Sequence, residues 1–183
     1  MHRTVQNLNV IKKFIISHLE DQSINKIPKI IAVSKTFSME KILPLIEYGH
    51  IDFGENKVQE AIDKWTVIKQ KNPNIKIHMI GKLQTNKVKF AVKLFDYIHS
   101  VDNAKLAQKI SDEQSKINKK IKIFIQVNIG DEDQKSGISK NKVFGLLSLC
   151  KKINLEVVGL MCIPPANVDS SKYFKEMNLL NHE

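Results

Sequence analysis

Short runs of β-branched residues alternate with helical segments along the chain, and this alternation limits the folds that it can adopt. The runs are rich in Ile and Val, and their length and composition are typical of strands. Strands that recur with helices between them indicate βα units and a parallel sheet. The six predicted strands are Lys29–Ser34, Ile51–Gly54, Ile75–Gly81, Tyr97–Val101, Ile121–Ile129 and Leu155–Met161.

The segments between the strands carry apolar residues at helical spacing. A first helix is predicted before the first strand, over Asn7–Leu19, and Ser38 and Asp102 suit the N-caps of two later helices. No linker, repeat or low-complexity tract divides the chain, so residues 1–183 are predicted to form one domain. The other predicted helices are Met39–Tyr48, Lys57–Gln70, Asn86–Leu94, Ala104–Ile117, Lys140–Lys152 and Tyr173–Leu180.

Two α/β architectures fit this order, a doubly wound sheet and a (β/α) barrel. A doubly wound nucleotide-binding fold normally has a glycine-rich turn after its first strand. Here the first strand runs into Ser34-Lys35-Thr36 without a glycine, and the whole chain has only 7. The sequence therefore favours a (β/α)8 TIM-barrel type. A complete barrel usually needs more than ~200 residues, so we expect one truncated to about six βα units with an N-terminal helix.

Composition argues against several classes of function. The formal net charge of +10 suggests nucleic acid, but Arg3 is the only arginine and the lysines are spread along the chain. Nucleic-acid sites usually rely on the bidentate fork of arginine, so we expect no specific nucleic-acid partner. No apolar run approaches a membrane span and no signal peptide is recognisable. Two cysteines without metal or redox spacing favour the reducing cytoplasm. The acidic run 131–133 lacks the later glutamate of a calcium loop, so no metal site is predicted.

Polar residues and glycines follow the predicted strands at their carboxyl ends, where the sites of parallel barrels lie. Lys35 is the sharpest candidate among them, because it directly follows the first strand. A lysine drawn towards an apolar interior has its pKa lowered by desolvation, and a neutral amine can form a Schiff base with an aldehyde. The alternative is a solvated lysine that merely follows a strand.

The other rim candidates each have a simpler structural interpretation. Asn56 suits a hydrogen bond to a ligand oxygen, but Gly-Glu-Asn is also common in turns. His78 lies in a strand, where a histidine is more often a hydrogen-bonded core residue than a catalyst. The loop from Gly81 to Lys87 suits an anion, or is a helix cap with solvated lysines.

Seven motifs, in order, cover almost the whole chain and resemble those of the pyridoxal phosphate homeostasis protein family. The fold of that family is similar to the N-terminal barrel of alanine racemase. The motifs are Ala32–Thr36, Phe53–Asn56 with Gln59 and Glu60, His78–Lys87, Ser100–Asp102, Gln126–Ile129, Lys135–Gly137, and Gly159–Met161 with Ile163 and Pro164.

The resemblance implies that Lys35 carries pyridoxal 5'-phosphate (PLP) as a Schiff base. It further implies that the cofactor pocket is framed by Asn56, His78, Gly81, Gln84 and Asn86. Such proteins are expected to act in intracellular PLP homeostasis as monomers without robust catalysis, and no catalytic residue is assigned. Racemases of this fold take a second base from a separate domain, which is not recognisable here. The alternatives are a PLP-dependent racemase or decarboxylase of the same fold, and a non-functional truncated gene product.

Two departures from the family pattern affect these expectations. Phe37 stands where family members often have a second lysine. The family also continues with further strands and helices that hold most of the phosphate cradle and an arginine facing the pyridine nitrogen. Without them the first and sixth strands are expected to be open sheet edges, which invite self-association. A poorly folding chain, a dimer and a shortened barrel with weak cofactor affinity are the three expected outcomes.

Overall fold

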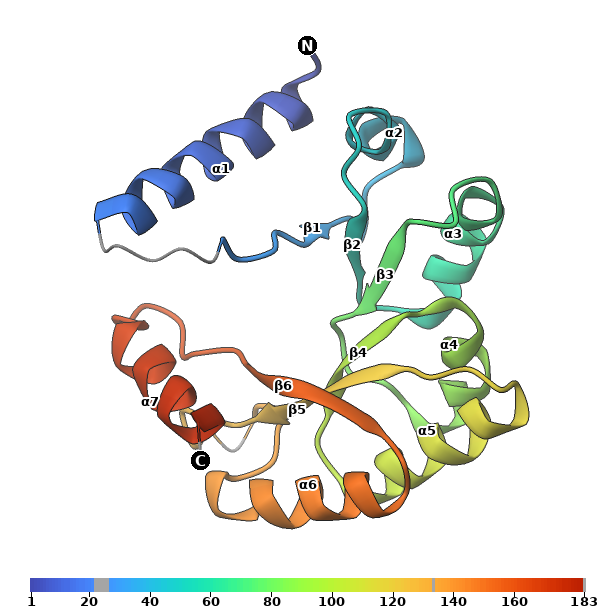
Figure 1. The fold of residues 1–183 in the computed structure, drawn as a ribbon, viewed down its shortest axis with the longest axis vertical. Coiled ribbons are helices and arrows are strands. Elements are labelled where there is room, and N and C mark those ends of the chain that lie inside the picture. The colour runs from blue at the N-terminus through green and yellow to red at the C-terminus, as the bar shows by residue number, and fades with distance from the viewer. Residues whose placement is uncertain (22–26, 133, 183) are drawn as a thin grey trace.

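The computed structural model describes residues 1–21, 27–132 and 134–182. These residues form one six-stranded parallel sheet with helices along it (Figure 1). The strands are β1 (Ala32–Val33), β2 (Asp52–Glu55), β3 (Lys76–Met79), β4 (Tyr97–Val101), β5 (Lys122–Val127) and β6 (Glu156–Cys162). The α-helices are α1 (Arg3–Asp21), α2 (Met39–Glu47), α3 (Val58–Lys71), α4 (Val88–Leu94), α5 (Ala104–Lys116), α6 (Val143–Lys152) and α7 (Ser171–His182). Two short 3₁₀ helices, η1 (Thr85–Lys87) and η2 (Lys140–Lys142), precede α4 and α6.

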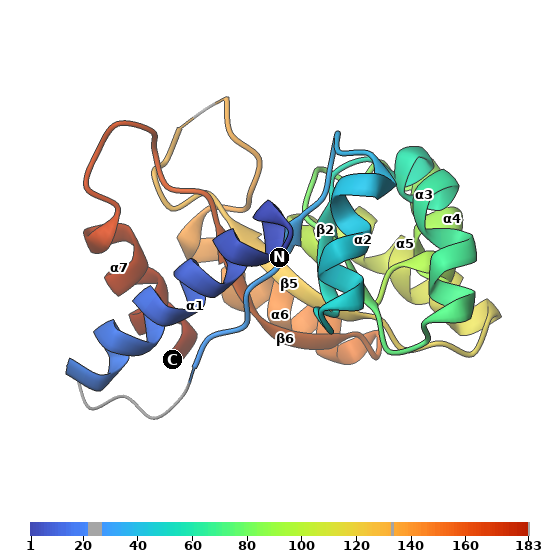
Figure 2. The same cartoon turned by 90° about the horizontal axis from the view of Figure 1, so that it is seen from above.

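The strand order identifies the architecture. The strands neighbour one another in the order β1 to β6, whereas a doubly wound sheet reverses direction near its middle. The sheet curves so that α2 to α6 lie on its outer side, as the cartoon seen from above also shows (Figure 2). Within the described residues β1 and β6 each have one neighbouring strand and the sheet is not closed. The prediction of barrel-type βα units with an N-terminal helix and two open edges is confirmed.

The main core lies between the outer face of the sheet and the helices. Alternate strand residues, such as Ile77 and Met79 on β3, are almost fully buried there. They pack with Trp65 of α3 and Phe95 after α4, which are both fully buried. Because side chains alternate across a strand, the intervening residues face the inside of the curved sheet. That inner face carries the candidate site.

The terminal helices contact the sheet less than the others. Helix α1 lies beside α2 and buries Val5 and Leu8, but Val10 and Phe14 are exposed. Helix α7 packs Met177 into a small second cluster beside β5 and β6. No helix in the described part of the chain is long and apolar enough to span a lipid bilayer.

The predicted element boundaries differ from the structure mainly at the ends. The first strand has only two residues instead of six, because β1 pairs with β2 alone. Ser38 takes the predicted N-cap position of α2, although its side chain makes no cap hydrogen bond. The predicted Asp102 cap of α5 was wrong. Asn103 is the N-cap, and its side-chain oxygen accepts a hydrogen bond from the Leu106 amide at 2.9 Å.

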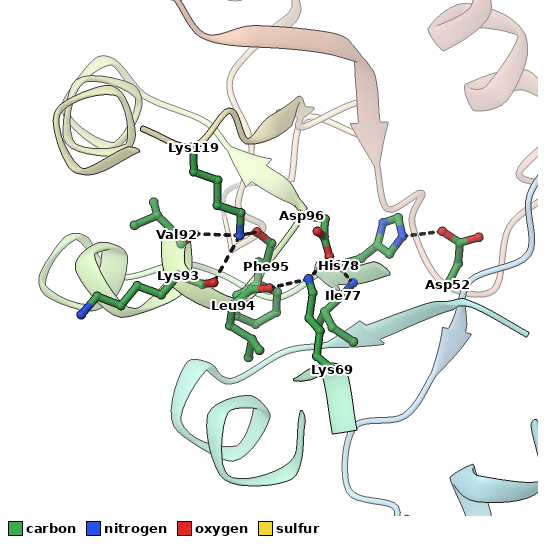
Figure 3. A network of polar contacts seen from close by, with 10 residues as sticks. All are labelled: Asp52, Lys69, Ile77, His78, Val92, Lys93, Leu94, Phe95, Asp96 and Lys119. Carbon is green, nitrogen blue, oxygen red and sulfur yellow. Dashed lines mark hydrogen bonds and ion pairs between the residues drawn. The ribbon is translucent and has the colours of Figure 1, made fainter. Parts of the chain in front are cut away.

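At the amino-terminal side of the sheet, two lysines donate hydrogen bonds to carbonyl groups at the end of α4 (Figure 3). Lys119 Nζ donates to the carbonyl oxygens of Val92 at 3.0 Å and Phe95 at 2.9 Å. Lys69 donates to the Leu94 carbonyl at 2.9 Å and to the Asp96 carboxylate. Cations at a helix C-terminus satisfy free carbonyls and the helix dipole, so this part of the positive charge has a structural role. Burial lowers the pKa of Lys119 to about 8.

Candidate functional site

The pairing of β1 with β2 places Lys35 and Asn56 just beyond the carboxyl ends of two neighbouring strands. Val33 is in register with Gly54, and the Ser34 amide donates to the Gly54 carbonyl at 2.9 Å. Two residues further along each strand stand Lys35 and Asn56. The structure therefore brings these two predicted site residues to the same carboxyl-end rim.

The environment of Lys35 differs from the expectation. The sequence predicted a desolvated amine at the mouth of an apolar strand, whereas Lys35 is exposed. The reason is the open sheet. Strand β1 lies at its edge, so no further strand in the described residues covers Lys35 on that side.

Asn56 and Gly81 are in tight contact, which explains the glycine. Glu55 is in register with Met79, so Asn56 is level with Ile80 and next to Gly81. A Cβ atom at Gly81 would lie 2.4 Å from the Asn56 carbonyl oxygen and 2.7 Å from its Cβ. Both distances are much shorter than an ordinary van der Waals contact distance. Gly81 is therefore required for the close approach of two rim loops, a role that the family resemblance alone did not reveal.

A Gly81→Ala variant should lose about 1–3 kcal/mol of unfolding free energy, the usual effect of overpacking. Urea unfolding, followed by the fluorescence of the single tryptophan, measures this loss. Gly145→Ala is the matched control, because a Cβ atom there meets nothing within 4 Å and Gly145 is an exposed residue of helix α6. Alanine is the better helix former by about 1 kcal/mol, so the control should gain stability. Equal effects of the two substitutions would contradict the close contact.

A cavity of about 370 Å³ lies beside Asn56. Gln84 lines it, together with the side chains of Lys57, Lys82 and Lys87. Among the described residues, the buried Asn56 side-chain oxygen has no hydrogen-bond partner, so it can accept a hydrogen bond from a ligand. Asn86, in η1, is exposed and does not line this cavity. Of the predicted loop residues, Gly81 and Gln84 thus lie with Asn56, and Asn86 lies apart.

His78 lies deeper, on the inner face of the sheet. It is in register with Gly54, two residues before Asn56, which is about 7 Å below the rim at the rise of a strand. Its Nε2 is 3.0 Å from Asp52 Oδ1 and its Nδ1 is 2.9 Å from His99 Nε2. Its ring stacks on Tyr97, with ring centres 4.4 Å apart. Both nitrogens are bonded, which matches the simpler interpretation of a satisfied core histidine.

The hydrogen bonds fix the tautomers of both neutral rings. A carboxylate only accepts, so the His78 Nε2 carries the proton that is donated to Asp52. His78 Nδ1 then accepts, and His99 Nε2 must donate to it. Burial lowers the pKa of His78, although the hydrogen bond to Asp52 opposes this. Burial, and then the charge of His78, lower the pKa of His99 to about 4. Both rings are therefore neutral at pH 7.

The residues that hold the rim together were missed by sequence reasoning. Glu55 is fully buried, and its Oε1 accepts hydrogen bonds from Ser34, Lys64 and Trp65 at 2.8, 2.9 and 2.9 Å. One signal pointed to Glu55, namely an acidic residue at the end of a buried strand. Nothing in the sequence singled out Lys64, which looks like any other helix lysine. Asp52 and His99 likewise gave no signal of their own.

Comparisons with known proteins agree with this geometry. Residues 16–181 match the family model described as alanine racemase, N-terminal domain. The pyridoxal phosphate homeostasis protein of Haemophilus influenzae is 35% identical over 163 residues, which are 86% of this chain and 68% of that protein. The chain belongs to the pyridoxal phosphate homeostasis protein family. The protein of that name from Buchnera aphidicola is 36% identical over 185 residues, and the alignment covers 97% of this chain and 79% of the relative.

Family members differ from this chain in length. The relatives from Pasteurella multocida and Vibrio alginolyticus are 38% and 37% identical, and the chain spans 61% and 66% of their lengths. Among solved structures, PipY of Synechococcus elongatus, with PLP bound, has a TM-score of 0.77 at 29% identity, covering 92% of this chain and 80% of PipY. Alanine racemase of Clostridium difficile has a TM-score of 0.65 at 16% identity, covering 92% of this chain and 44% of the racemase, and shows likeness of fold.

Proposed function

We propose that this chain binds PLP covalently through Lys35 and acts in intracellular PLP homeostasis. The observation that carries the proposal is the place of Lys35. It follows the first strand at the same carboxyl-end rim as Asn56, in a fold whose relative PipY has been solved with PLP bound. Sites of parallel barrels lie at this rim.

The described residues fit such a cofactor. The exposed Lys35 amine is accessible to an aldehyde, and the unpaired Asn56 oxygen can accept a hydrogen bond from a ligand. Three lysines line the cavity beside Asn56, namely Lys57, Lys82 and Lys87. Their combined charge favours an anion such as a phosphate. Glu60 offsets part of it through its 2.7 Å contact with Lys57.

Each residue has a distinct task in this proposal. PLP supplies an aldehyde and an electron-withdrawing ring. Lys35 provides the nitrogen that bonds to the aldehyde carbon, and Asn56 orients the ring by a hydrogen bond. Gly81 keeps the second rim loop close to Asn56. Gln84 lines the cavity beside Asn56, His78 lies below it on the inner face of the sheet, and Asn86 stands in η1 of the same loop.

We propose that the protein is not a robust enzyme, that it works in the cytoplasm as a monomer, and that it has neither a specific nucleic-acid nor a membrane partner. Relatives carry the name of homeostasis proteins. Two acid–base groups on the inner face, His78 and His99, are each engaged in the hydrogen-bonded chain to Asp52. Amino-acid racemisation well above that of free PLP would contradict this part of the proposal.

A Lys35→Ala variant should lose covalent cofactor capture completely. Purified protein is incubated with PLP, reduced with borohydride and digested, and the adduct is located by mass spectrometry. The matched control is Lys29→Ala, an exposed lysine just before β1 at its other end, which should keep the adduct. An adduct that persists in Lys35→Ala, or labelling spread equally over many lysines of the wild type, would refute the role of Lys35.

A further inference from the structure

Strand β1 is held only weakly by the sheet ladder. It has two residues, and in the described part of the chain it has one neighbouring strand and one further backbone bond, from the Ser34 amide to the Gly54 carbonyl. Edge strands with so few bonds are the first to open. Lys35 follows immediately, so something else must fix its position if it is to capture a ligand.

Ser34 is the point at which other contacts converge. Its hydroxyl donates to Glu55 Oε1 at 2.8 Å. Its carbonyl accepts from Lys64 Nζ at 2.9 Å and from the Phe37 amide at 3.2 Å. Lys64 also donates to Glu55 Oε1 at 2.9 Å. One carboxylate and one ammonium group therefore hold the residue that precedes Lys35.

The backbone turn that carries Lys35 needs the contacts of Glu55 and Lys64 with Ser34 to keep its conformation. The bond from Phe37 to Ser34 closes a four-residue turn with Lys35 in second and Thr36 in third place. Thr36 has a φ of 64°, a left-handed conformation that a β-branched residue rarely adopts. Strained backbone persists where the surrounding structure holds it, and such places cluster at ligand sites.

The Glu55–Lys64 ion pair is suited to hold the Ser34–Phe37 turn in place. The Glu55 side chain is fully buried and that of Lys64 is 14% exposed, so water weakens this pair far less than a surface pair. Charge-assisted hydrogen bonds of this kind are the stronger ones. The pair also connects the carboxyl end of β1 to the core, because Lys64 lies on α3 next to the buried Trp65.

We propose that Glu55 and Lys64 are positioning residues that hold the Ser34–Phe37 turn so that the Lys35 amine is presented to the aldehyde of PLP. Capture forms a C=N bond between the lysine nitrogen and the aldehyde carbon. The carbonyl oxygen leaves as water with two hydrogens of the neutral amine, and nothing is oxidised or reduced. The proposal rests on the proposed function for its ligand, but the ordering of the turn is independent of it.

The test compares Lys64→Met with Lys69→Met. Both lysines stand on α3, and each binds one carboxylate and one backbone carbonyl. Lys64 does so beside Lys35, whereas Lys69 binds Asp96 and the Leu94 carbonyl at the other end of the sheet. Lys64→Met should slow borohydride-trappable capture at Lys35 roughly tenfold, the effect of losing one hydrogen bond to a charged group. Lys69→Met should leave the capture rate unchanged.

A second measurement separates positioning from general loss of stability. In cofactor-free protein, hydrogen exchange at the Phe37 amide should be faster in Lys64→Met and unchanged in Lys69→Met. Lys64→Arg keeps donors for Ser34 and Glu55 and should restore most of the capture rate. Glu55→Gln, which keeps the shape of the buried side chain, should weaken capture as Lys64→Met does.

The outcomes distinguish the two proposals. If the wild type forms no adduct at Lys35, the proposed function fails, and the exchange of the Phe37 amide alone decides whether the turn is held. If the wild type forms the adduct while Lys64→Met and Glu55→Gln match it in rate and exchange, the positioning role is wrong and the proposed function stands. Equal slowing by Lys64→Met and Lys69→Met would also overturn the positioning role.

Discussion

A Trp65→Ala variant should lose about 3–5 kcal/mol of unfolding free energy, the usual cost of removing a buried tryptophan. Trp65 is fully buried in the core and its ring centre lies 4.8 Å from that of Phe53 on β2. Its indole N–H donates to Glu55 Oε1 at 2.9 Å. The substitution therefore removes packing between α3 and the sheet and one donor to a buried carboxylate. Domains are typically stable by only about 5–15 kcal/mol, so a loss of this size removes a large share of the total stability.

Trp65→Phe separates the two contributions. It keeps an aromatic ring against Phe53 but removes the donor and the smaller part of the indole's packing volume, so a loss of about 1–3 kcal/mol is expected, less than for alanine. Urea unfolding must be followed by far-ultraviolet circular dichroism, because the chain has a single tryptophan. A Trp65→Ala protein within ~1 kcal/mol of the wild type, less than a typical buried truncation costs, would mean that α3 is not packed on the sheet as described.

The elements and their order followed from the sequence because they depend on local periodicity. Each of the six predicted strands is present, and the seven predicted helices overlap α1 to α7. The absence of glycine after Val33 correctly favoured a barrel over a doubly wound sheet. The ends of the elements were less accurate. The choice between Asp102 and Asn103 as N-cap depends on a one-residue shift of the backbone, which residue type alone does not reveal.

The contacts of the site were less predictable because they join distant segments. Glu55 and Lys64 are nine residues apart, and the angle at which α3 packs on the sheet decides whether they meet. The environment of Lys35 was predicted wrongly for a related reason. Its exposure depends on what lies beyond the edge of β1 and not on the apolar residues of β1 itself.

Acid should destabilise the protein between pH 6.5 and 4 through the inner-face histidines. His99 has an ordinary pKa of 6.5, and burial and the neighbouring His78 lower it to about 4 in the folded chain. The unfolded chain therefore binds more protons in this range, so stability is fully present above pH 6.5 and is lost as the pH falls towards 4. The difference corresponds to about 3 kcal/mol for His99. His78 acts in the same direction, since burial outweighs the opposing charges of Asp52 and Asp96.

The pH range distinguishes this effect from ordinary acid unfolding. Hydrogen bonds from Lys109 and Lys116 lower the pKa of Glu113 from 4.5 to about 2, so its contribution is lost only at lower pH. Urea midpoints followed by Trp65 fluorescence from pH 7.5 to 4 should fall steadily. His99→Gln keeps an N–H group near His78 but does not titrate, and its profile should be flatter. The exposed histidine His182 is the matched control, because His182→Gln should keep the wild-type slope. If His99→Gln also keeps that slope, the Asp52–His78–His99 chain does not control the acid sensitivity.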